Sequence, residues 1–225
     1  MIERQKDESG KCGETFAGSP RTWSVSEYEE EDGEKFMDAR EEEDQNPYVI
    51  HSTYLVNLAT PKDDLFEKSL NCLQSELDAA STLGVEYLVF HPGAHTGSGR
   101  ETGIKRIAEG IDELEIPENV TLLLENTAGK GTTLGKSMGE LRQMIEQAET
   151  DSSKIGVCID TCHAHSAGYD LVSEESFQDF IQEIKEDIGL DKIKVLHLND
   201  SKDERGSEKD NHQDIGYGNI GEKGF

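Results

Sequence analysis

The chain has 225 residues, which is enough for one domain with a sizeable core. It is strongly acidic, because 48 Asp and Glu residues against 22 Lys and Arg residues give a formal net charge of −26. Such a charge can indicate disorder, but regular apolar strands and amphipathic helices favour a folded protein with an acidic, hydrated surface, as in halophiles, where salt screens self-repulsion.

The N-terminal segment MIERQKDESG is charged and lacks the apolar region of a secretory signal, and we expect residues 1–10 to be poorly ordered. No apolar run approaches the roughly 20 residues that cross a bilayer. The four cysteines form no dense framework and are expected as small core residues. These features predict a cytoplasmic protein without a membrane partner.

Short apolar segments then alternate with helical patterns along the chain. A segment around Thr15 is a possible strand, and further strands are expected at 48–50, 87–90, 121–124, 155–159 and 193–196. Apolar residues with helical spacing lie between them, at 66–80, 104–114, 138–148 and 177–188. Continuous apolar strands between amphipathic helices are typical of a parallel sheet covered by helices, so the fold class is α/β.

A metal-type side chain stands at the end of each of the last five strands. These residues are separated by 40, 34, 35 and 37 positions along the chain: His51, His91, Glu125, Asp160 and His197. A TIM (β/α)8 barrel gathers all strand ends on one face, whereas an open sheet spreads them across its width. The sequence therefore predicts a barrel.

The predicted barrel is incomplete. Eight units of this length need roughly 290 residues, and the chain has room for about six. We expect residues 1–225 to form a single barrel domain that is truncated, without the first strand and without the last strand or two.

Two short motifs add further candidate ligands to the strand ends. Asp160 is followed by His163, and Asp210 by His212. Carboxylates and imidazoles suit zinc or manganese in a catalytic site. Any one of these histidines could simply be hydrogen-bonded, and Asp160 could be a helix N-cap. Eight candidates exceed what one zinc ion uses, so two or three ions are expected, an arrangement that suits phosphodiester hydrolysis.

Two other histidines, His95 and His165, are expected outside this ligand set, as supporting or surface residues. The spacing of Cys158 and Cys162 is a poor match for a structural zinc site.

Several long motifs resemble one family. They are HSTYLVNLATP at 51–61, HPGAH at 91–95, LLLENTAGKG at 122–131, GVCIDTCHAHSAGYD at 156–170 and LHLNDSK at 196–202, with GYGNIGEKGF at the end. Over residues 10 to 225 the sequence closely resembles endonuclease IV, the zinc-dependent apurinic/apyrimidinic endonuclease family. The acidic composition is similar to that of a halophilic archaeal member.

The resemblance implies a TIM barrel with three zinc ions. His51 and His91 would bind one ion, and Glu125, as the catalytic bridging ligand, would join it to a second. Asp160 and His197 would hold the second ion. The third ion would be bound by His163, Asp210 and His212.

The resemblance also implies the reaction. A zinc-bound hydroxide would cut the phosphodiester 5′ to an abasic site in double-stranded DNA, leaving a 3′-hydroxyl and a 5′-deoxyribose phosphate. Arg21, Tyr54 and Leu55 match side chains that contact the DNA and enter its base stack. Ordinary loop packing is the alternative for Tyr54 and Leu55. The protein is expected to act as a monomer.

Two features of the family have no counterpart here: its opening strand and its final glutamate ligand. Eight of nine expected ligands are thus present. Two other functions stay open, a metal-dependent sugar isomerase or epimerase on the same kind of barrel, and an inactive fragment.

Overall fold

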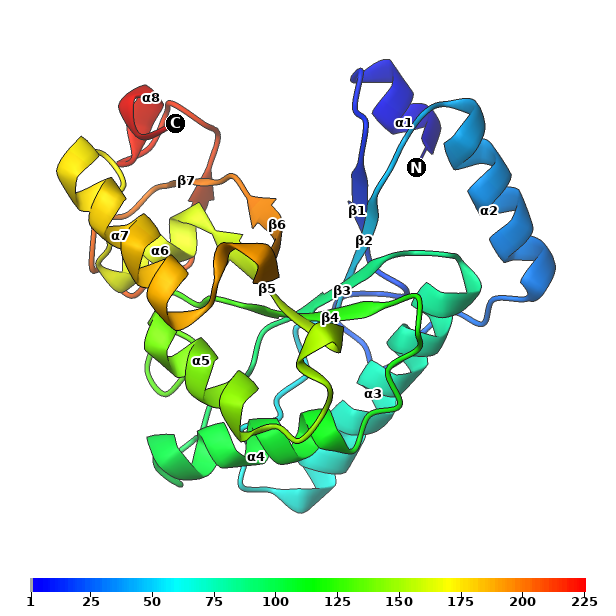
Figure 1. The fold of residues 1–225 in the computed structure, drawn as a ribbon, viewed down its shortest axis with the longest axis horizontal. Helices are drawn as coiled ribbons and strands as arrows, with labels where there is room; N and C mark the ends of the chain where they lie inside the picture. The colour runs from blue at the N-terminus through cyan, green and yellow to red at the C-terminus, as the bar shows by residue number, and fades with distance from the viewer. Residues whose placement is uncertain (1) are drawn as a thin grey trace.

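A computed structural model describes residues 2–225, and its centre is a six-stranded parallel sheet (Figure 1). The strands pair in chain order: β1 (Gly13–Thr15), β2 (Tyr48–His51), β3 (Tyr87–Phe90), β4 (Thr121–Glu125), β5 (Ile155–Asp160) and β6 (Ile193–His197). The main helices are α2 (Glu30–Glu42), α3 (Asp63–Thr82), α4 (Arg100–Asp112), α5 (Met138–Gln147), α6 (Thr161–Ala167) and α7 (Glu174–Asp187). Smaller elements are α1 (Ile2–Asp7), the strand pair β7 (Asp200–Ser201) and β8 (His212–Gln213), and α8 (Gly221–Gly224).

The sheet is an incomplete barrel. Every pair from β1–β2 to β5–β6 is parallel, and helices cross over between successive strands. Within residues 2–225, β1 and β6 each have one neighbour in this sheet, so they form its two edges. The predicted fold class, an α/β barrel that does not close, is confirmed.

Apolar side chains fill both faces of the sheet. The larger cluster lies between the sheet and its helices and includes Leu88, Leu122 and Ile107. A smaller cluster on the other face contains Val49, Val89, Leu123 and Cys158. The central strands are therefore buried on both faces, which explains why they are continuous apolar runs.

The expected helical stripes coincide with α3, α4, α5 and α7. Gly84 follows α3 with a φ of +64°, a conformation that favours glycine at a helix end. Helix α2 was not expected, because its sequence is dominated by acids. Arg40 anchors it, donating a hydrogen bond to the Gly84 carbonyl and forming an ion pair with Glu86.

The poor order expected for residues 1–10 stays a prediction, and the structure describes a short helix in this segment. Met1 lies outside the described residues, but Ile2–Asp7 form helix α1. Gln45 donates a hydrogen bond to the Ile2 carbonyl, and Lys6 pairs with Glu43. Polar contacts with residues at and after the end of α2 therefore hold α1 in place, and α1 has no apolar stripe that would have predicted a helix. Cys12 is exposed, so the expectation that all four cysteines are core residues was wrong for this one.

None of the helices within residues 2–225 is both long enough and apolar enough to cross a membrane.

Candidate metal centre

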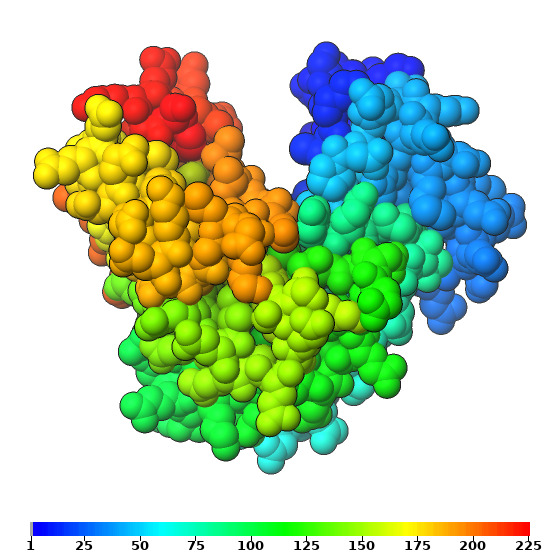
Figure 2. All heavy atoms as spheres, viewed as in Figure 1, coloured from blue at the N-terminus to red at the C-terminus, as the bar shows by residue number. Residues whose placement is uncertain are grey.

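A deep cleft opens on the face where the strands end. Figure 2 shows the hollow between the N-terminal part, in blue, and the C-terminal part, in orange and red. Its volume is about 1010 Å³, and the side chains lining it come from both edge strands and from the strand ends between them. Within residues 2–225 β1 and β6 do not pair, so the cleft between them opens to solvent.

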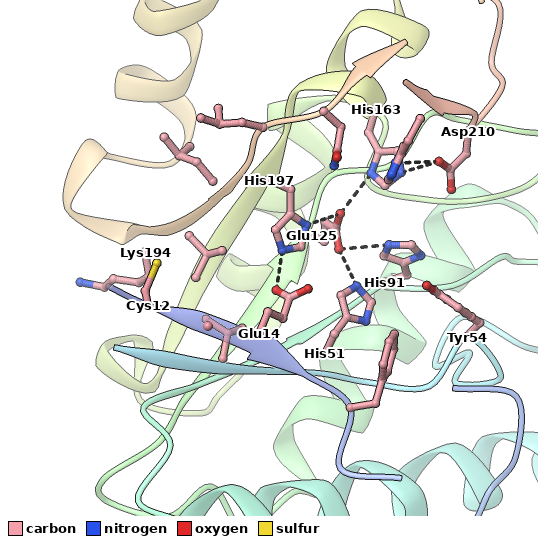
Figure 3. Close-up of a pocket in the computed structure, with 18 of the residues that line it drawn as sticks. Cys12, Glu14, His51, Tyr54, His91, Glu125, His163, Lys194, His197 and Asp210 are labelled. Carbon is pink, nitrogen blue, oxygen red and sulfur yellow. Dashed lines mark hydrogen bonds and ion pairs between the residues drawn. The ribbon is translucent and has the colours of Figure 1, made fainter. Parts of the chain in front are cut away.

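Glu125 is the centre of the candidate site (Figure 3). It is the last residue of β4 and is buried. Its Oε2 lies 3.0 Å from His51 Nε2 and 3.1 Å from His91 Nε2. Its Oε1 lies 3.1 Å from His197 Nδ1 and 3.2 Å from His163 Nδ1. One carboxylate thus faces two separate pairs of imidazoles.

A second group of side chains lies beside this carboxylate. Asp210 Oδ1 is 3.2 Å from His163 Nε2 and 3.0 Å from His212 Nε2. Asp160 Oδ2 is 3.7 Å from His212 Nε2 and 4.0 Å from His197 Nδ1. All eight side chains singled out in the sequence are therefore brought together, and the five strand ends converge as the barrel geometry requires.

Local structure fixes the orientation of Asp160. It ends β5 and caps α6, where its Oδ1 accepts a hydrogen bond from the His163 backbone N–H. The N-cap and the ligand hypotheses are thus compatible, since Oδ2 remains directed into the site. Asn199 donates a hydrogen bond to that oxygen. The Asn126 side-chain amide donates a hydrogen bond to the Asp160 carbonyl and accepts one from the Asp160 N–H.

The electrostatics tie the acids and imidazoles together. Burial alone would raise the pKa of Glu125, but His91, His163, His197 and His51 together hold that pKa well below its usual range. Burial opposes the charged form of His163, yet Asp210 and Glu125 raise its pKa well above the ordinary value. The acids and imidazoles thus stabilise one another's charged forms, and a bound metal ion would compete with protons for the same ligand atoms.

The donor set fits metal ions. Ligand atoms within 4.8 Å of one another form one group from His51, His91 and Glu125, and another from Asp160, His163 and His212. Further groups include Cys158 and Cys162. Burial raises the pKa of the Cys158 thiol to about 12, and a hydrogen bond with His197 opposes that rise.

The three residues expected to contact DNA come from two adjoining loops, here called the rim loops, and Tyr54 lines the cleft. The Pro20 carbonyl accepts hydrogen bonds from the Tyr54 N–H and the Thr53 hydroxyl, which holds the loop before Arg21 against the loop after β2. Arg21 is exposed and Leu55 is half-buried. The Tyr54 side chain is 61% exposed, and its ring centroid lies 5.9 Å from that of His51. Tyr54 therefore borders the site without being packed into the core.

His95 and His165 lie outside the ligand groups. The His95 ring accepts hydrogen bonds from the N–H groups of Gly97 and Gly99, which shapes its own loop. His165 is buried within α6, so it is not a surface residue.

Sequence reasoning missed Glu14 on β1, whose Oε2 lies 2.7 Å from His197 Nε2 (Figure 3). A strand of three residues offers no periodic pattern, so the sequence held no signal that points this side chain into the cleft.

The fold and the convergent strand ends define an enzyme of the xylose isomerase-like TIM barrel class, and residues 10–225 match the family model of that description. A D-tagatose 3-epimerase-like protein has a similar structure, with a TM-score of 0.75 over 96% of this chain and 76% of that one. Its sequence identity is only 21%, so this likeness shows the fold alone.

The particular family follows from more similar proteins. The chain is 45% identical to the probable endonuclease 4 of Haloarcula marismortui, over 100% of this chain and 80% of that protein. It is 44% identical to that of Natronomonas pharaonis, with the same coverage. The crystal structure of endonuclease IV from Thermus thermophilus superposes with a TM-score of 0.87 at 34% identity, over 99% of this chain and 79% of that one. The chain belongs to the endonuclease IV family.

Proposed function

We propose that this chain cuts double-stranded DNA at the phosphodiester 5′ to an abasic site and that it uses three zinc ions. The observation that carries the proposal is the double-sided position of Glu125, whose two oxygens face two different pairs of imidazoles within 3.2 Å. A carboxylate in this position suits the bridge between two cations.

We infer the following division of the side chains among the three ions. His51 and His91 would hold the first ion on the Oε2 side of Glu125. Asp160 and His197 would hold the second on the Oε1 side. His163, Asp210 and His212 would hold the third, in line with their contacts of 3.2 and 3.0 Å. Bound zinc would supply Lewis-acid activation of water and of the phosphate.

The rim loops would recognise the DNA. Tyr54 offers an exposed aromatic face next to His51, and Arg21 offers a positive charge on the adjoining loop. An aromatic ring at this place can stack on a base beside the gap that a missing base leaves. Leu55, which follows Tyr54, would fill the same gap. These three side chains would set the abasic site over the ligand cluster.

Because the chain is acidic overall, DNA binding would have to rest on the metal ions and the side chains around the cleft. Three Zn²⁺ ions change the formal charge of −26 to −26 + 6 = −20, so the surface as a whole repels a polyanion. At about 1 M salt the Debye length is about 3 Å, and this repulsion is largely screened. Incision is therefore expected to tolerate molar salt.

The test is an incision assay on a labelled duplex that contains one abasic site, in molar KCl with zinc supplied. We expect a nick with a 3′-hydroxyl and a 5′-deoxyribose phosphate, together with about three zinc ions per chain. Glu125→Gln removes the charge but keeps the shape, and it should reduce incision by roughly 100-fold or more, because the proposed bridge between two ions would be lost.

Two results would contradict the proposal. One is the absence of incision by the zinc-loaded wild type. The other is a content of only one ion together with turnover of a ketose sugar, which would favour an epimerase.

A further inference from the structure

Glu14 contacts one of the proposed ligands from the opposite side of the cleft. It lies on β1, one edge of the sheet, and His197 lies on β6, the other edge. Glu14 Oε2 is 2.7 Å from His197 Nε2, although the residues are 183 positions apart. Among the edge-strand residues that line the cleft, this pair joins the two unpaired edges by a direct polar contact (Figure 3).

The two ring nitrogens of His197 face different partners. Nδ1 lies 3.1 Å from Glu125 Oε1 and 4.0 Å from Asp160 Oδ2, where the second ion would bind. Nε2 faces Glu14. A neutral imidazole carries its proton on one nitrogen and its lone pair on the other. When Nε2–H donates to the Glu14 carboxylate, the lone pair is on Nδ1 and is directed at Glu125 and Asp160.

Glu14 is badly placed to be a ligand itself. The nitrogens of an imidazole point away from each other, so a carboxylate bonded to Nε2 is on the far side of the ring from an ion on Nδ1. The group of close ligand atoms around His197 contains Glu125 and Cys158, and it does not include Glu14. Its role is therefore to orient another side chain.

The position of His197 explains why such support matters. His51, Glu125 and Asp160 end strands that have a neighbouring strand on each side. His197 ends an edge strand and lines the open cleft. A hydrogen bond from the ring to Glu14 supplies a second point of attachment there, which restricts rotation of the imidazole.

We propose that Glu14 is a positioning residue that holds His197 with Nδ1 directed at the second metal ion. This role rests on the proposed metal centre. Carboxylates that accept a hydrogen bond from a metal-bound imidazole typically contribute about 10- to 100-fold to metal affinity.

The test is a zinc titration of the full chain against a competing fluorescent chelator, with total zinc measured by mass spectrometry. In Glu14→Ala we expect one of three ions to bind about 10- to 100-fold more weakly, with the other two unchanged. Glu14→Gln should recover most of that loss, because its amide oxygen still accepts the Nε2–H hydrogen bond. Glu67→Ala on the exposed face of α3 makes the same change in charge and should bind like the wild type.

A second readout separates positioning from general stability. Nitrogen-15 chemical shifts of His197 in the zinc-loaded protein should show a protonated Nε2 and a metal-bound Nδ1 in the wild type, and exchange between states in Glu14→Ala. Three ions bound by Glu14→Ala with wild-type affinities would overturn the positioning role alone. A wild type that binds no zinc would overturn the metal centre together with it.

Discussion

Strands β5 and β6 are neighbours with similar sequences and different surroundings. Both are apolar runs that end in a proposed metal ligand. All six residues of β5 are buried, whereas β6 alternates between half-buried and exposed residues, and Leu196 is 58% exposed. An apolar pattern therefore indicates that a strand exists, but it does not say how many neighbours pack against it. That number decides how firmly the ligand at its end is held.

The largest effect is expected from removing apolar side chains in the two environments. Leu123→Ala on β4 empties a fully buried position between Val89 and Cys158 and should lower the free energy of unfolding by about 3 kcal/mol. Leu196→Ala on β6 should change it by about 0.5 kcal/mol or less, because the side chain is largely in water already. Urea unfolding at pH 7 measures both. Equal losses would show that β6 is covered in solution.

An intermediate effect is expected from Asp200, which organises the chain after β6 by polar contacts. Its carboxylate accepts hydrogen bonds from the backbone N–H groups of Ser201, Gly216, Gly218, Ile220 and Gly221. Asp200→Asn replaces one accepting oxygen by a donor and leaves at least two amides unpaired, so we expect a loss of about 2 kcal/mol.

Amide hydrogen exchange shows which part of the chain loses stability in Asp200→Asn. In Asp200→Asn, either the amides of Ser201 and Ile220 or those of Gly216, Gly218 and Gly221 lose their acceptor and should exchange faster, while those of β5 keep their protection. Uniform loss of protection would mean that the segment after β6 unfolds together with the central sheet and is not a separate unit.

The smallest effect concerns Glu76 on α3, a buried carboxyl behind the strand that ends in His51. Burial raises its pKa, against the hydrogen bond from the Thr53 N–H and the charge of the nearby His51 imidazole. A carboxyl whose pKa is higher in the folded state costs stability as the pH rises above its unfolded value, 4.5. Glu76→Gln should therefore be more stable at pH 8 by about 0.5–1 kcal/mol, with no gain below pH 4. Thermal unfolding of both proteins between pH 4 and pH 8 measures how the stability difference changes with pH. A difference that does not depend on pH would refute the prediction.

The sequence predicts what depends on period and spacing. The strand from Tyr48 to Ile50 and the ligand candidates from His51 to His197 follow from apolar runs and from the geometry of parallel strands. Glu14 does not follow, because its side chain reaches His197 only after the sheet has curved through all six strands. Helix α2 does not follow either, because the Arg40 contacts with Gly84 and Glu86 that hold it are polar, and no periodicity encodes them.

The contact between Glu14 and His197 also sets a time scale for biosynthesis. The two residues are 183 positions apart, so at translation rates of 5–20 residues per second the ribosome adds His197 roughly 10–40 s after Glu14. During that interval the ribosome adds β2 to β5, and the Glu14 carboxylate has no His197 imidazole to contact. The proposed second ion site can therefore form only late in synthesis, and the proposed cluster is complete only after Asp210 and His212, which follow β6, have been added.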